Sequence, residues 1–312
     1  MENKPLAERM RPKSLEDYIG QQHLVGPGKV LRKMIDSGVV SSFILWGPPG
    51  VGKTTLAMII AEQLKRPFYV LSAVSSGVKD VREVIQKAEG QRFFNTPNPI
   101  LFIDEIHRMP KFIEEILYPA MEDFELDLVI NNDGKSRNLK IDLPPFTLVG
   151  ATTRAGDISA PLRDRFGIIN KLQYYTEDEL KEIILRTSRV LEMPIEEEAA
   201  ALLAKRCRKT PRIANRLFKR VRDFALVGGY KTITYDLANR SLERLKVDED
   251  GLDAIDIEYL TSLIEKFGGG PVGVETISTS IGEEVSTIED VVEPFLLQEG
   301  FIKRTPRGRV AL

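Results

Sequence analysis

The sequence contains very little cysteine, histidine and tryptophan. Its 312 residues include one cysteine, two histidines and one tryptophan. A single cysteine excludes an intramolecular disulfide, and so few His and Cys residues exclude a typical zinc cluster. Cys207 lies in a basic segment with a helical pattern, and we interpret it as an ordinary small residue.

Long apolar runs are also lacking. No stretch is apolar for long enough to span a bilayer, and residues 1–8 have no apolar signal core. We therefore expect no membrane association and a cytoplasmic location. The length predicts two or three domains.

The chain has little net charge, and its charge is unevenly distributed. The formal net charge is −2, which alone argues against a nucleic-acid binder. Lys205 to Arg222, however, holds nine basic residues and no acid, and residues 301–312 hold four basic residues and no acid. Local patches of this kind matter more for binding a polyanion than the net charge does.

A glycine-rich loop is the most specific motif present. Residues 47–54 read GPPGVGKT, between an apolar run at 43–46 and a helical pattern at 55–64. Glycines let backbone N–H groups surround a phosphate chain, Lys53 reaches the β- and γ-phosphates, and the Thr54 hydroxyl binds Mg²⁺. The loop therefore predicts a site for ATP and Mg²⁺.

Two carboxylates end a second apolar run, at residues 100–105. In a phosphate-loop enzyme, Asp104 would hold the metal and Glu105 would polarise the attacking water. Both motifs in this order predict an ATP hydrolase.

The pattern from about residue 40 to 170 alternates apolar strands with helices, which predicts an α/β core with a parallel sheet. The expected strands are residues 43–46, 68–71, 100–104, 147–152 and 168–172. A predicted β-hairpin, residues 126–143 with an Asp-Gly turn, interrupts this rhythm. It is either a surface loop or an arm that docks a partner or substrate.

The remainder predicts an all-helical lid and a winged helix. A capping box at Thr176 and a proline at Pro211 each start a lid helix. Further helices are expected at 254–267 and 274–281. A capping box at Ser286 would start a last helix, 287–299, that Pro294 bends, followed by a basic hairpin. The expected domains are 1–175, 176–246 and 247–312.

Three further residues narrow the class of ATPase. Thr153 ends the strand that follows the acidic one, where a polar sensor stands beside the γ-phosphate. Arg165 follows at the position of an arginine finger, and Arg212 opens a lid helix at the position of a second sensor. Together they predict a ring-forming AAA+ ATPase.

From about residue 104 onward the chain resembles the RuvB family of Holliday-junction branch-migration motors. The resemblance rests on the strings DEIHR (104–108), EEILYPAMED (114–123), KIDLPPFTLVGATTR (140–154), PLRDRFG (161–167), GGGPVG (268–273) and RTPRGR (304–309). It implies ATP-driven branch migration in recombination and DNA repair.

The resemblance also implies residue roles. Met10 and Arg11 would lie by the adenine. The phosphates would be held by Gly50, Lys53, Thr54 and Thr55, and further nucleotide contacts would come from Glu122, Asp123, Phe124, Tyr175 and Arg212. Arg165 would serve the neighbouring subunit. Arg304 and Arg309 would contact DNA phosphates, and Arg307 belongs to the same basic hairpin.

Partners follow from the same resemblance. We expect a homo-oligomeric ring, a hexamer, that acts on double-stranded DNA and four-way junctions. The hairpin 126–143 would dock a RuvA-like junction-binding protein. Val285 stands where these motors often have a DNA-contacting arginine, which predicts weaker DNA affinity.

The first hundred residues instead resemble RarA/MgsA, a replication-associated AAA+ ATPase. The relevant segments are residues 5–13, 19–28, 42–47 and 75–83. They fit a natural mosaic, a divergent lineage or an engineered chimera equally well, and a RarA-like ATPase acting at replication forks is the alternative function.

Two other interpretations are weaker. A sequence-specific regulator would read bases with helix 287–299, but that segment has no Arg, Lys or Asn and one Gln. Residues 104–107 mimic a DExH helicase box; the finger and second sensor favour the AAA+ interpretation, which leaves His107 as a structural residue.

Overall fold

The computed structural model describes residues 6–73, 97–132 and 135–312. Their contacts divide the chain into two compact units. The sheet unit comprises Arg11–Gly47 and Gly52–Gln173, and the lid–wing unit comprises Met1–Met10, Pro48–Val51 and Tyr174–Leu312. The glycine-rich loop thus contributes residues to both units. No helix among the described residues has the length and apolarity needed to cross a bilayer.

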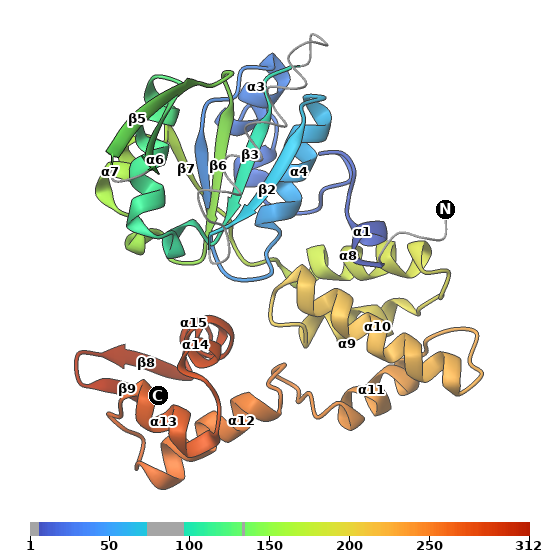
Figure 1. The fold of residues 1–312 in the computed structure, drawn as a ribbon. Helices are drawn as coiled ribbons and strands as arrows, with labels where there is room; N and C mark the ends of the chain where they lie inside the picture. Colours follow the sequence, from blue (N-terminus) through green and yellow to red (C-terminus); the bar gives the residue numbers. More distant parts are fainter. Residues whose placement is uncertain (1–5, 74–96, 133–134) are drawn as a thin grey trace. The chain divides into compact units, whose positions relative to one another are not determined.

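The sheet unit is built on five parallel strands in the order β2-β3-β6-β1-β7. The strands are β1 (Phe43–Trp46), β2 (Phe68–Ser72), β3 (Ile100–Asp104), β6 (Thr147–Thr152) and β7 (Ile168–Lys171). They lie side by side in Figure 1. The central strands are almost wholly buried apolar runs, as expected of a sheet covered on both faces. The predicted parallel sheet is confirmed.

Helices α2 (Gln22–Val25) and α3 (Val30–Ser37) precede β1. The connections between the strands contain α4 (Lys53–Gln63), η2 (Ile106–Arg108), α6 (Lys111–Glu122), η3 (Ala155–Asp157) and α7 (Ala160–Asp164). Helix α4 starts directly at the glycine-rich loop, which is the strand–loop–helix context that the motif requires.

The predicted hairpin is also present, as β4 (Glu125–Asn132) paired with β5 (Lys135–Asp142). Figure 1 shows it as a strand pair separate from the main sheet. Its Asp-Gly turn at 133–134 lies outside the described residues. Leu126 and Leu143 are buried against Ala120 of α6, which anchors the base of the hairpin.

The lid consists of α8 (Glu177–Val190), α9 (Glu197–Lys205), α10 (Pro211–Val227) and α11 (Tyr235–Arg244), with α1 (Leu6–Met10) from the start of the chain. Thr176 and Glu179 form the predicted capping box, and Pro211 is the first residue of α10. Burial raises the pKa of the Cys207 thiol to about 12, which agrees with an inert core residue.

The winged helix follows. Its elements are α12 (Ala254–Thr261), η4 (Ser262–Lys266), α13 (Val274–Ile281), α14 (Val285–Thr287), η5 (Ile288–Val292), α15 (Glu293–Gln298), β8 (Ile302–Thr305) and β9 (Gly308–Ala311). Gly282 ends α13 in a left-handed conformation, with φ of 73°, and so makes the expected turn. Fold class is confirmed throughout: an α/β AAA+ core, a helical lid and a winged helix.

The predicted capping box at Ser286 is wrong. The helix starts two residues earlier than predicted, at Val285, and its N-cap is Glu284 without a side-chain cap. The Ser286 hydroxyl donates instead to the Glu284 carboxylate at 3.4 Å. Pro294, which lacks an N–H, follows a π-helical turn, η5, that interrupts the predicted continuous helix.

A third short segment completes the wing. Val272 forms an antiparallel bridge with Arg309, with N–H···O distances of 3.0 and 2.8 Å. Two glycines permit this approach. A Cβ on Gly270 would meet the Arg309 carbonyl oxygen, and a Cβ on Gly308 would meet that of Val272. Gly270 and Gly308 are therefore packing requirements of the wing.

Candidate nucleotide site and nucleic-acid interface

The lysine of the glycine-rich loop, Lys53, forms a hydrogen bond to the backbone of the same loop. Gly52 has φ of 97° and is the N-cap of α4, so Lys53 is the first helical residue. Lys53 is only 7% exposed, and its Nζ donates to the Gly47 carbonyl oxygen at 2.8 Å. Thr54 and Thr55 follow in the first turn and are half-buried. A buried ammonium and the N–H groups of a helix start together form an anion-binding site.

The loop residues of the lid–wing unit contact two predicted site residues. The Arg212 backbone N–H donates to the Gly50 carbonyl at 3.4 Å, and a Cβ on Gly50 would lie 2.9 Å from the Cβ of Arg212. The buried Tyr175 hydroxyl donates to the Val51 carbonyl at 3.3 Å. Gly50, with φ of 80°, therefore cannot carry a side chain without displacing Arg212.

The carboxyl ends of β3 and β6 bring the acidic pair to the first sensor. Glu105 follows β3 in a left-handed conformation, with φ of 50°, and its N–H donates to an Asp104 oxygen at 3.2 Å. The Thr153 hydroxyl donates to Glu105 Oε2 at 3.3 Å. Strained backbone at this point fits a catalytic position. The predicted water activator and sensor are thus adjacent.

His107 extends this group. Its Nδ1 lies 2.9 Å from Thr152 Oγ1 and 3.3 Å from Glu105 Oε2. Burial lowers the pKa of His107, while the Glu105 carboxylate acts in the opposite sense. His107 thus contacts both Glu105 and the end of β6, which places it beside the acidic pair. Its position two residues after Glu105 is the signal that could have indicated it.

Arg165 lies in a second cluster of the sheet unit. Its guanidinium forms an ion pair with Glu122 at 3.0 Å, donates to the Pro161 carbonyl at 2.7 Å, and lies 4.3 Å from the Tyr118 ring centroid. The two residues after Glu122, at the end of α6, are also predicted site residues: Asp123 is its C-cap and Phe124 has φ of 56°. The finger candidate is therefore held in place by α6.

The two candidates for the adenine site belong to different units. The Met10 carbonyl accepts from the Arg186 guanidinium of α8 at 3.0 Å within the lid–wing unit. Arg11 Nη1 lies 2.9 Å from the Met58 sulfur of α4 within the sheet unit.

The three wing arginines have different surroundings. Glu293, which is 0% exposed, binds the guanidinium groups of both Arg304 and Arg309 at 2.8 Å and accepts from the Tyr259 hydroxyl at 3.0 Å. Arg309 also pairs with Glu289 at 2.8 Å. The side chain of Arg309 is 14% exposed and that of Arg304 is 44% exposed. Burial opposes the charge of Arg309, but its bonds to Glu293 and Glu289 raise its pKa.

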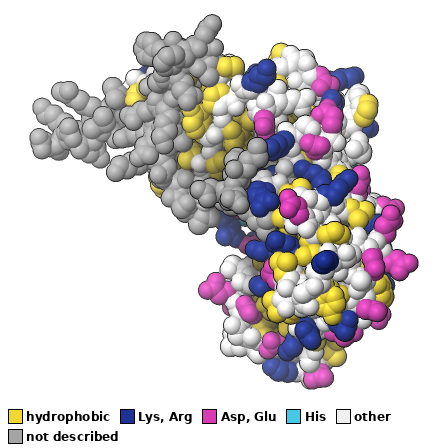
Figure 2. Space-filling model, turned by 90° about the vertical axis from the view of Figure 1, so that its right-hand side faces the viewer, with side chains coloured by type: hydrophobic (Ala, Val, Ile, Leu, Met, Phe, Trp, Pro, Cys, Tyr) yellow, Lys and Arg dark blue, Asp and Glu magenta, His cyan; other side chains and the backbone are white. Residues whose placement is uncertain are grey.

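Arg307 lies at the tip of the hairpin and is exposed. Its described contact is a backbone N–H bond to Thr305 Oγ1. On the face that Figure 2 shows, side chains of both charge signs are interspersed.

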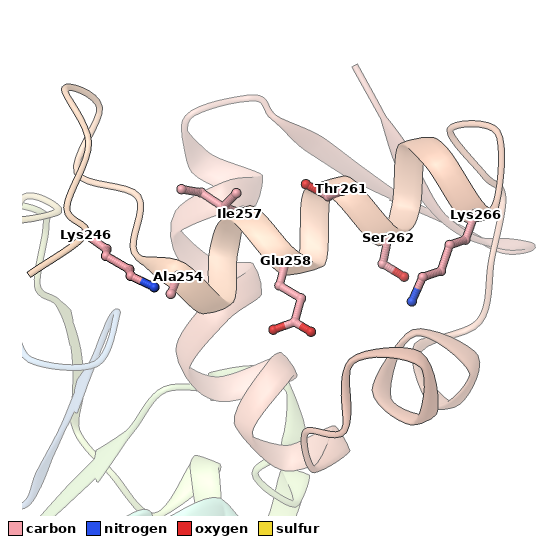
Figure 3. Close-up of a pocket in the computed structure, with 7 residues that line it drawn as sticks. All are labelled: Lys246, Ala254, Ile257, Glu258, Thr261, Ser262 and Lys266. Carbon is pink, nitrogen blue, oxygen red and sulfur yellow. The ribbon is translucent and has the colours of Figure 1, made fainter.

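A hollow of about 450 Å³ lies on the outer face of α12 and η4. Figure 3 shows its lining, in which Glu258, Ser262 and Lys266 point into the same space. Lys266 donates to the Ser280 hydroxyl at 2.9 Å, which ties η4 to α13. No group of three or more His, Cys, Asp or Glu residues suited to a metal occurs among the described residues. We assign no function to this hollow.

Family models match the whole length of this arrangement. The Holliday junction DNA helicase RuvB P-loop domain matches residues 10–172, the RuvB AAA lid domain 175–248, and the RuvB C-terminal winged helix domain 249–311. The chain belongs to the RuvB family. It is accordingly an AAA+ ATPase.

Individual relatives agree with the RuvB assignment. The Holliday junction branch migration complex subunit RuvB of Phytoplasma mali is 50% identical over 306 residues, which are 97% of this chain and 90% of that protein. Its counterpart in Lawsonia intracellularis is 52% identical over 97% of this chain and 88% of its own length. The Thermotoga maritima RuvB branch migration motor is 44% identical, with a TM-score of 0.84 over 97% and 96% of the two chains.

These matches correct the expectation of a mosaic. The RuvB P-loop model begins at residue 10, and the relatives align over 97% of the chain, so the first hundred residues are RuvB sequence. The RarA-like alternative is not favoured. The two families share nucleotide-binding chemistry in this region, which explains the resemblance of the short strings. The string at 75–83 lies outside the described residues.

Proposed function

We propose that this chain is the motor subunit that uses ATP hydrolysis to drive branch migration at four-way DNA junctions in recombination and repair. The observation that carries the proposal is the order of three RuvB-specific modules along one chain, each with its expected fold.

The nucleotide would bind with its phosphates on the loop at the start of α4. Lys53 supplies the positive charge at the β- and γ-phosphates, Glu105 orients the attacking water, and Thr153 fixes Glu105 through its hydroxyl. The Thr54 hydroxyl and the Asp104 carboxylate are oxygen ligands of the kind that Mg²⁺ prefers. When bound, Mg²⁺ would neutralise charge on the phosphates.

Arg165 would complete the site of a neighbouring subunit. It lies on the sheet unit beside Glu122 and at the end of a short helix, α7, which suits a finger presented at an interface. Hydrolysis then requires a homo-oligomeric ring, which we propose to be a hexamer.

DNA would bind at the wing, chiefly through phosphate contacts of Arg307 and Arg304. Arg309 would act mainly by shaping the hairpin, since its guanidinium is engaged by two carboxylates. The β4–β5 hairpin would dock a RuvA-like protein. Since a DNA junction is the proposed substrate, we also propose a cytoplasmic location.

The deciding assay is ATP-dependent branch migration of a synthetic four-way junction, with and without added RuvA. Branch migration should separate the junction into two duplexes only when ATP is present, and Glu105→Gln should abolish this separation. No migration under any condition, in a preparation that hydrolyses ATP, would contradict the proposal.

A further inference from the structure

The segment between α9 and α10 is fastened to the winged helix by an arginine. Arg208 Nε donates to the Gly251 carbonyl at 3.1 Å, and its guanidinium pairs with Asp253 at 3.1 Å and with Asp256. Arg208 is 8% exposed and Asp256 is 0% exposed. Breaking a buried pair of this kind leaves an uncompensated charge, so the contact is strongly maintained.

The partners of Arg208 belong to the start of α12 and to α15. Asp253 and Asp256 form the capping box of α12, and the Phe295 ring lies 5.4 Å from the Arg208 guanidinium. The next residue, Lys209, pairs with Glu299 at 2.6 Å. Two consecutive lid residues therefore hold the first helix of the winged helix and the end of its last helix.

The other side of the same segment contacts the glycine-rich loop. The Lys209 carbonyl accepts from the Tyr175 N–H at 3.0 Å, and the Tyr175 hydroxyl donates to Val51. Four residues after Arg208, the Arg212 N–H donates to Gly50. All these contacts lie within the lid–wing unit.

The backbone of the segment is strained. Arg208 and Lys209 have φ of 52° and 53°, a left-handed conformation that residues with a side chain rarely adopt consecutively. Gly251 approaches so closely that a Cβ would lie 2.8 Å from the Arg206 carbonyl oxygen. Such conformations persist only where surrounding contacts determine them, so this segment is a fixed connection and not a free linker.

We infer that Arg208 is a positioning residue that couples DNA binding at the winged helix to the second sensor, Arg212. The inference rests on the proposed function. A shift of α12 or α15 when the wing binds DNA moves Arg208 and Lys209, and through them the backbone that places Arg212 and Tyr175 against the loop. Coupling of this kind is reciprocal, so ATP must change DNA affinity by the same factor as DNA changes ATP affinity.

The test uses the full-length protein with Arg208→Gln and Asp256→Asn combined. This double variant removes the charges of Arg208 and Asp256 together, so neither of the two is left buried without its opposite charge. Lys205→Gln, which removes an exposed charge three residues away, is the matched control. The measurements are the duplex-DNA Kd with and without ATPγS, kcat and KM for ATP with and without saturating duplex, and the thermal unfolding profile.

In the wild type and the control, ATPγS should change the duplex Kd, and saturating duplex should raise kcat. Two ratios are compared: the duplex Kd without ATPγS over that with it, and kcat with duplex over that without it. In the double variant, each ratio should move toward one by at least about fivefold, since about fivefold is the lower end of typical coupling factors. The duplex Kd without nucleotide should stay within about twofold of the wild type. Unchanged ratios in a folded double variant would overturn the inference. The inference would also be overturned if a higher duplex concentration restored the full increase in kcat in the double variant, because Arg208 would then only support DNA binding. A wild type that does not respond to DNA would refute the proposed function as well.

A charge exchange gives a second, milder test. Lys209→Glu places two carboxylates against each other, and it should reduce the effect of ATPγS on the duplex Kd and the effect of duplex on kcat. Adding Glu299→Lys should restore both effects. These side chains are partly exposed, so the variants are expected to fold. Failure of the exchange to restore ratios that Lys209→Glu had lowered would count against the coupling route.

Discussion

The glycine-rich loop and the wing are both proposed to bind phosphates, but they are built differently. The loop relies on backbone groups and one buried cation, Lys53, fixed by a helix start. The wing relies on guanidinium groups, of which Arg304 and Arg309 are bound to the buried Glu293 and Arg307 is exposed at the tip. Catalysis requires one geometry with little water, whereas movement along DNA requires contacts that many positions can satisfy. Substitutions near the glycine-rich loop should therefore affect ATP turnover. Substitutions in the wing should affect folding stability or the salt dependence of DNA binding.

The largest effect is expected at Arg165. Arg165→Ala should lower ATP turnover by about 10³-fold or more, because a finger arginine stabilises charge at the phosphates. Lys53→Ala should be similarly inactive. Mixing the two variants should restore part of the turnover, since some interfaces then combine an intact loop with an intact finger. The exposed neighbour Arg163→Ala is the control. If no mixing ratio restores turnover although mixed oligomers form, Arg165 does not act on a neighbour.

Glu105→Gln should lower kcat by about 10²- to 10⁴-fold, the usual contribution of a general base, while nucleotide affinity changes little. The side-chain carbonyl oxygen of the substituted glutamine can still accept a hydrogen bond from the Thr153 hydroxyl, so the site keeps its shape. Steady-state turnover and equilibrium nucleotide binding separate the two effects. Glu115→Gln on the exposed side of α6 is the control. Near wild-type turnover in Glu105→Gln would remove its assignment.

Arg309→Ala should destabilise the winged helix by about 3 kcal/mol, because Glu293 is fully buried and loses one of its two cations. Differential scanning calorimetry should show the loss as a lower temperature for the winged-helix transition. Arg304→Ala should cost less, since its guanidinium is half exposed. Equal stability of Arg309→Ala and wild type would mean that this arginine is available to DNA after all.

Arg307→Ala should give the smallest effect. Losing one phosphate contact should reduce the log–log salt slope of duplex binding by about 0.9, equally for unrelated sequences. The change in folding free energy should stay within about 0.5 kcal/mol, as for other exposed positions. Arg307→Lys keeps the charge and should keep the slope. A slope unchanged in Arg307→Ala would place the DNA contact elsewhere.

The catalytic constellation could be predicted from sequence because parallel strands end at one edge of a sheet. Asp104 and Thr152 end β3 and β6, which are neighbours, so Glu105 and Thr153 had to lie close together. The partners of the arginines could not be predicted. Glu293 at the start of α15 meets Arg309 of β9, and Arg208 reaches Asp256 from another domain. Such pairs depend on tertiary packing, which no local spacing encodes. The capping box was misplaced for a local reason, since Ser286 bonds to Glu284 and the helix begins before it.

The close approach of Gly270 and Gly308 to opposing carbonyls has a consequence for local opening of the wing. The Val272 N–H donates to the Arg309 carbonyl oxygen, and the Arg309 N–H donates to the Val272 carbonyl oxygen. Neither amide can reach solvent unless the whole hairpin separates from the glycine segment. Their hydrogen–deuterium exchange should therefore proceed at one shared slow rate, as a single cooperative unit, while the Arg307 amide at the tip exchanges independently and fast.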